Sequence, residues 1–173
     1  KQSLRVGRRG RLAWESATPA AYRVHSGLCN PGYAAPPPHG IPVMQAKGEF
    51  EVTRIPQEEL DIGEGATVGH SRFDKRFHGP LDATSVVHML AVMSAVPGSG
   101  AYVAMERIEG TLDGRRGSFF AQHNGVMDRG KPTLDLTVVP DTGTGDLTGL
   151  HGRIAIDIVD GKHSYTFDYD FRE

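Results

Sequence analysis

The sequence predicts a single all-β domain, an eight-stranded antiparallel up-and-down β-barrel. Three observations lead to this expectation: polar and apolar residues alternate along many short segments, turn-forming residues separate these segments, and glycine is abundant, with 22 among 173 residues. Alternation is typical of a strand with one buried face, and glycine with proline marks turns. Many short strands separated by turns predict a sandwich or a barrel. We favour the barrel because closure removes exposed strand edges.

Eight segments fit this pattern. In chain order they are residues 47–54, 67–78, 84–93, 101–108, 118–127, 133–139, 150–159 and 162–171. The first alternates until the proline-containing segment 55–59 breaks it. The third could also form a helix with His88 and Val92 on one face, but the β-branched pair Val86-Val87 favours a strand.

Asp-Gly dipeptides predict hairpin turns in the second half of the chain. Asp113-Gly114 and Asp160-Gly161 are such dipeptides, and this pair of residues suits the positive φ angles of a tight hairpin. Residues 128–132 and 140–146, rich in glycine, proline and aspartate, predict two further turns.

The last three segments have a clear interior face. Side chains at alternate strand positions point to the same side of a sheet, and in these segments the aromatic and aliphatic residues share one parity. The expected interior residues are Leu134, Leu136, Val138, Ile154, Ile156, Ile158, His163, Tyr165, Phe167, Tyr169 and Phe171.

The two middle segments, 101–108 and 118–127, carry polar and apolar residues on both faces, so the sequence does not decide which face is buried. If Tyr102 and Glu106 point inward, burial raises the pKa of Glu106 unless a partner compensates. A carboxylate beside imidazoles is a plausible general acid–base set.

We therefore take Glu106, His123 and His163 as candidate catalytic residues, and Tyr102, Gln122 and Tyr165 as candidate ligand-binding residues. Each group of residues also has a structural interpretation. Either histidine can be a satisfied core residue, and Tyr165 can pack with its hydroxyl at the rim. Glu106 can pair with Arg107 of a neighbouring molecule or with Lys75 on the surface.

Composition excludes several classes. A net charge of −2 argues against nucleic-acid binding, and no apolar run approaches the roughly 20 residues of a membrane helix. The single cysteine, Cys29, excludes an intrachain disulfide and a cysteine zinc site. No two histidines have the spacing of a typical metal-ligand pair, so we expect no metal. The sequence contains no phosphate-binding loop and no nucleophile elbow, and we expect no cofactor. We expect a cytoplasmic protein whose partner is a small apolar molecule, and leave a homo-oligomer open.

Residues 1–43 differ from the rest, because they are arginine-rich, lack apolar periodicity and contain Pro36-Pro37-Pro38. This composition predicts an extended or disordered extension, with residues 44–173 forming the barrel and Met44 a natural start. The alternative is a native tail that packs on the domain through Trp14.

Longer stretches of the second half resemble a known family. They include residues 102–115, residues 138–145 and Asp160-Gly161-Lys162-His163-Ser164-Tyr165. The chain resembles, over residues 45–173, an uncharacterised bacterial family of unknown function grouped with the allene-oxide-cyclase-like barrels. The resemblance implies an eight-stranded antiparallel barrel. The plant cyclases bind a fatty-acid epoxide and steer its ring closure, but their catalytic residues do not map onto this sequence, and a shared fold does not transfer function.

Three functions follow from these expectations. The first is a barrel that binds a small apolar ligand without chemistry, which requires a cavity of a few hundred Å³ or more. The second is an isomerase, cyclase or hydrolase, which requires Glu106 and a histidine within hydrogen-bond reach and facing one cavity. The third is an oligomeric structural or interaction module with a filled barrel, which eight strands permit.

Overall fold

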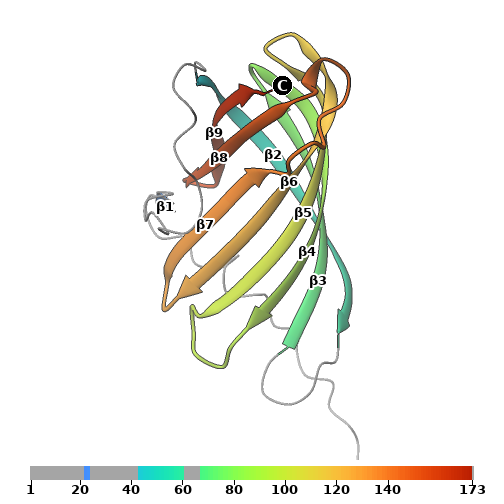
Figure 1. The fold of residues 1–173 in the computed structure, drawn as a ribbon. Coiled ribbons are helices and arrows are strands. Elements are labelled where there is room, and N and C mark those ends of the chain that lie inside the picture. Colours follow the sequence, from blue (N-terminus) through green and yellow to red (C-terminus); the bar gives the residue numbers. More distant parts are fainter. Residues whose placement is uncertain (1–21, 24–42, 61–66, 173) are drawn as a thin grey trace, which may run out of the picture.

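The computed structural model describes residues 22–23, 43–60 and 67–172. Eight of the strands in this part of the chain form a closed antiparallel barrel (Figure 1). The elements are β1 (Tyr22–Arg23), β2 (Met44–Leu60), β3 (Thr67–His78), β4 (Leu81–Met93), β5 (Gly100–Leu112), β6 (Arg115–Asp128), β7 (Lys131–Val138), the 3-10 helix η1 (Gly145–Leu147), β8 (Leu150–Val159) and β9 (Lys162–Phe171). The predicted extension 1–43 lies outside the described residues, apart from β1 and Val43.

The barrel has up-and-down order. From β2 to β9 each strand pairs with the next one along the chain, and β2 also pairs with β9, which closes the barrel. β7 and β8 share little backbone pairing, because Thr137 and Arg153 are the one pair that joins them in the described residues. We call this weakly paired boundary the seam. The two-residue strand β1 lies against β8 at Asp157 and Ile158. The predicted all-β barrel is confirmed.

Tight turns connect the hairpins as the dipeptides indicated. Asp113 and Gly114, between β5 and β6, both have positive φ angles, of 48° and 79°. Asp160 and Gly161, between β8 and β9, have 50° and 78°. Two consecutive positive φ angles are those of a type I′ turn, whose twist matches the flanking strands.

Four strands, β2, β4, β5 and β6, are longer than predicted by several residues, and β2 differs most. The expected break at residues 55–59 is wrong, because β2 continues to Leu60 with a register irregularity between Pro56 and Glu59. Pro56 is tolerated because the pairing with β9 ends at Phe50, so β2 has β3 alone as its partner there. A proline that lacks an N–H group is accepted where one side of the strand is unpaired.

The interior has a closed half and an open half. The closed-half core is a cluster of buried side chains beside β8 and β9 that includes Phe50, Phe77, Leu81, Ile108, Leu112, Phe119, Leu136, Ile154, Tyr165, Phe167 and Tyr169. The open-half cluster contains Phe73, Val87, Met89, Ala91 and Ala104, with Val52 and Tyr102 packed against it.

The open half exists because the β8–β9 hairpin is shorter than the sheet opposite it. Figure 1 shows β3 to β6 extending well past this hairpin. Exposure along β8 rises accordingly, from 3% at Ile154 to 40% at Ile158. Inward-facing side chains such as Leu134 and Tyr102 are therefore only part-buried.

Candidate functional site

A layer of four polar side chains separates the two apolar clusters. Lys75 on β3, Ser85 on β4, Glu106 on β5 and His123 on β6 are all buried and all face inward. On β5, for example, Glu106 stands between Ala104 of the open-half cluster and Ile108 of the closed-half core. We call these four residues the polar layer.

Glu106 is the centre of the polar layer. Lys75 Nζ donates to its Oε2 at 2.8 Å, His123 Nε2 lies 2.7 Å from the same oxygen, and the Ser85 hydroxyl donates to Oε1. The residue is completely buried, so these three partners replace the water that burial removes. Lys75 is also placed above the rings of Phe50 and Phe77, at 5.2 and 5.7 Å, where the negative face of a ring attracts a cation.

Small neighbours make room for this contact. In the register of β5 and β6, Glu106 lies opposite Ala121, and His123 lies opposite Ala104. Diagonal neighbours on one face of a sheet are within reach of long side chains, so the carboxylate and the imidazole meet across the space that the two alanines leave free.

The polar layer determines its own protonation state. Burial alone would raise the pKa of Glu106, but the Lys75 ammonium and the hydrogen bonds from His123 and Lys75 outweigh it and lower the pKa to about 2. Burial lowers the pKa of His123, against the opposing effect of its hydrogen bond with Glu106. At neutral pH the carboxylate is therefore ionised and the imidazole is neutral.

Tyr102 borders the polar layer on the open side. Its ring centroid is 6.5 Å from that of His123. The ring lies over Gly125, where a Cβ atom would come within 2.1 Å of it, so a glycine at this position lets the ring fold inward. Burial and the nearby Glu106 raise the pKa of Tyr102 to about 12, and its hydroxyl stays protonated.

The other predicted site residues lie outside the polar layer. His163 packs 5.1 Å from the Phe50 ring, and burial, together with Lys75, lowers its pKa. The Tyr165 hydroxyl accepts from the Leu81 N–H at 3.1 Å and donates to the His78 carbonyl at 3.2 Å, which ties down the β3–β4 turn.

Gln122 is exposed on the outer face of β6, opposite to His123. Its position does not fit a ligand site inside the barrel. Of the two partners in the structural interpretation of Glu106, Lys75 is the one observed, but their ion pair lies in the interior and not on the surface.

Sequence reasoning named Lys75 only as a surface partner of Glu106, and it missed Ser85. The sequence does contain a signal for an interior Lys75, because this residue alternates with Phe73 and Phe77 on one strand. All three side chains are buried. Lysine is almost never fully buried unless it is paired, so a surface position was the natural expectation.

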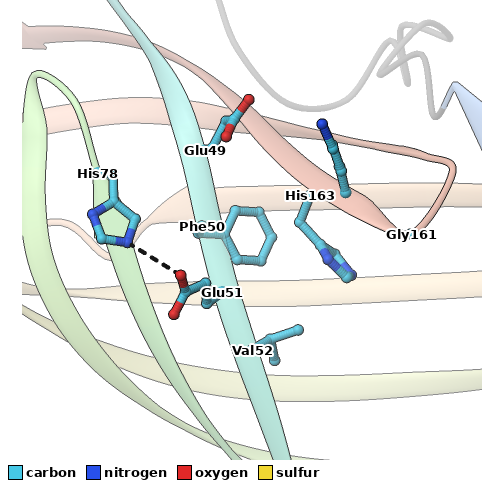
Figure 2. A pocket seen from close by; sticks show the side chains of 8 residues that line it. Glu49, Phe50, Glu51, Val52, His78, Gly161 and His163 are labelled. Atoms are coloured by element: carbon cyan, nitrogen blue, oxygen red, sulfur yellow. Dashed lines mark ion pairs between the residues drawn. The ribbon is translucent and has the colours of Figure 1, made fainter.

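A pocket of about 400 Å³ lies where the β8–β9 hairpin ends beside β2. Figure 2 shows Phe50 and His163 facing each other in it, and the ion pair between Glu51 and His78 at its edge. The lining residues are Glu49, Phe50, Glu51, Val52, His78, Gly161, Lys162 and His163. Phe50, Val52 and His163 face the interior, whereas the charged members are exposed, so the pocket opens to the outside.

Two further properties apply to the described residues. No group of three or more histidine, cysteine, aspartate or glutamate side chains in them is arranged to hold a metal ion. None of their helices is long and apolar enough to cross a membrane.

Acid is expected to destabilise the protein through the polar layer. The folded-state pKa values of Glu106 and His123 are both lowered, so the unfolded chain binds more protons and stability rises with pH. The loss should begin below about 6.5 for His123 and continue between about 4.5 and 2 for Glu106. The Glu106 contribution is on the order of 3 kcal/mol. Urea unfolding at a series of pH values between about 7 and 2 measures the loss, and an unchanged free energy of unfolding over this range would contradict the assignment.

Fold and site together define a small antiparallel β-barrel with a buried carboxylate, ammonium and imidazole network. The chain belongs to the DUF3224 family, described as a protein of unknown function, whose model matches residues 46–169. This confirms the predicted membership in a family of unknown function.

A solved structure from Shewanella oneidensis MR-1, described as a protein with unknown function from the DUF3224 family, is similar to this chain. The two are 42% identical with a TM-score of 0.73, and the match covers 76% of this chain and 100% of that one. No curated protein matches the chain.

Proposed function

We propose that the barrel binds a small apolar molecule in the open half of its interior. The observation that carries this proposal is the partial exposure of side chains that point inward. Val52, Tyr102 and Leu134 face the interior, yet all three remain part-buried. This partial exposure leaves room for a ligand beside them.

The chemistry of the open half suits an apolar ligand. Its wall consists of Phe73, Val87, Met89 and two alanines, and the polar layer forms its floor. Ligand sites are typically apolar, with a few polar groups that fix orientation. The small side chain of Ala91 leaves space that a larger residue would occupy.

The pocket beside β2 supports the same proposal. Its volume of about 400 Å³ lies within the usual range of small-molecule sites. Val52 lines this pocket and also packs against the open-half cluster, so pocket and open half border one another.

The burial of Glu106 favours binding over an enzyme in which this residue handles protons. Its hydrogen bond with His123 meets one requirement of the enzyme interpretation, at 2.7 Å. However, Glu106 has no exposed surface, and both of its oxygens are occupied. A carboxylate with a pKa of about 2 is also a weak base at neutral pH.

We also infer kinship with the allene-oxide-cyclase-like barrels. The eight antiparallel strands in up-and-down order support it, although a common fold transfers no activity. Superposition on a plant allene oxide cyclase tests the inference, and a different strand order there would contradict it.

The binding proposal is tested with the fluorescent apolar probe N-phenyl-1-naphthylamine. Bound probe should gain fluorescence and, at about 100 times its Kd, raise the Tm by roughly 5 °C or more. The variant Ala91→Trp should fill the open half and abolish both effects, since Ala91 is buried on β4.

Leu90→Trp is the matched control, because Leu90 is the adjacent residue and is exposed on the outer face of β4. It should bind the probe like the unaltered protein. The proposal fails if the unaltered protein does not bind the probe, or if Ala91→Trp folds and binds it equally well.

A further inference from the structure

We propose that the ligand is a neutral, largely apolar hydroxyl compound, whose O–H donates to Nδ1 of His123 and accepts from the hydroxyl of Tyr102. This inference rests on the proposed function and names the class of ligand. Its basis is the arrangement of hydrogen-bond donors and acceptors at the floor of the open half.

The first step is the position of the hydrogen on His123. Nε2 of His123 lies 2.7 Å from Oε2 of Glu106. An ionised carboxylate can only accept, and a neutral imidazole carries a single N–H. The shared hydrogen is therefore on Nε2, and Nδ1 is left as an acceptor.

The second step is that Nδ1 is accessible. Within the described residues, the hydrogen bond of the His123 ring is the one to Glu106. Every buried side-chain nitrogen or oxygen in that part of the chain has a partner. Because Nδ1 has none, it must reach solvent-accessible space, and His123 faces inward, so this space is the interior.

The same reasoning applies to Tyr102. Its hydroxyl has no hydrogen bond to a described residue, although no buried polar side-chain atom there lacks one. The hydroxyl therefore also reaches accessible space, and the ring that carries it has its centroid 6.5 Å from that of His123. The two groups present an acceptor and a hydroxyl beside an apolar wall.

These groups select among ligand classes. A carboxylate has no hydrogen to donate to Nδ1. A ligand ammonium would be repelled by the ammonium of Lys75, which is buried in the polar layer. An ether cannot donate either, whereas a hydroxyl donates and accepts at once. The apolar wall accommodates the remainder of the molecule.

Competition against N-phenyl-1-naphthylamine tests the inference with two matched compounds, 2-naphthol and 2-methoxynaphthalene. In the unaltered protein 2-naphthol should bind about ten-fold more tightly, because the ether leaves Nδ1 without a partner. His123→Leu should remove this preference but retain binding. Gln122→Ala, on the outer face of the same strand, should leave the preference unchanged.

Tyr102→Phe provides a second variant that does not touch Glu106, and it should weaken the binding of 2-naphthol, whose oxygen loses the donor from Tyr102, even if His123→Leu fails to fold. Equal binding of the two compounds by the unaltered protein overturns the inference while leaving the proposed function intact. A preference that survives His123→Leu, or an unchanged affinity of Tyr102→Phe for 2-naphthol, also overturns it. If neither the probe nor the two compounds bind, the proposed function itself fails.

Discussion

Replacing Glu106 with leucine is expected to lower the free energy of unfolding by about 3–5 kcal/mol. The substitution leaves the Lys75 ammonium buried without its counter-charge, since the two side chains are 7% and 1% exposed. It also removes the acceptor of Ser85 and His123. Chemical denaturation followed by circular dichroism measures the change.

The double variant Lys75→Met/Glu106→Leu is the control for this interpretation. Removing both charges of a buried pair is often neutral or stabilising, so the double variant should recover much of the stability that Glu106→Leu loses. A single variant within about 1 kcal/mol of the unaltered protein, or a double variant less stable than the single one, would show that the ion pair is not the cause.

Phe119→Ala should destabilise the barrel by about 3–5 kcal/mol. Phe119 is 1% exposed and stacks on Phe167 with ring centroids 5.8 Å apart, so its removal leaves a cavity in the closed-half core. The adjacent Phe120 points to the opposite face and is 40% exposed, and Phe120→Ala should cost less than about 1 kcal/mol. Thermal and urea unfolding of the two variants compare them directly, and equal losses would contradict the assigned facing of β6.

Local chemistry explains why the second half of the fold was predictable. Asp113-Gly114 and Asp160-Gly161 form the expected turns, and β8 and β9 have the predicted bounds. Tight turns and short hairpin strands depend mainly on residues that are close together in the sequence. The continuation of β2 past Pro56 depends instead on which side of the strand is unpaired, and this is a property of the assembled sheet.

The candidate site was predictable in part. Glu106 and His123 were named, but their facing could not be chosen, because the outer face is also apolar. Val103, Met105 and Phe120 are exposed there, and their side chains resemble those of a core. Lys75 could be placed only by the full register of β3, β4 and β5, which carries it to Glu106.

The sparse backbone pairing at the seam between β7 and β8 has a consequence for self-association. Beyond Thr137 and Arg153, the edge of β7 that faces β8 has no partner strand among the described residues, and such an edge can recruit another molecule. The short β7 carries Pro132, which lacks an N–H group, and Asp135, whose carboxylate pairs with Arg153 across the seam at 3.1 Å. Proline and charge on an edge are devices that discourage intermolecular strand pairing. The seam therefore leaves part of the β7 edge unpaired, while Pro132 and the Asp135–Arg153 ion pair discourage another strand from adding to it.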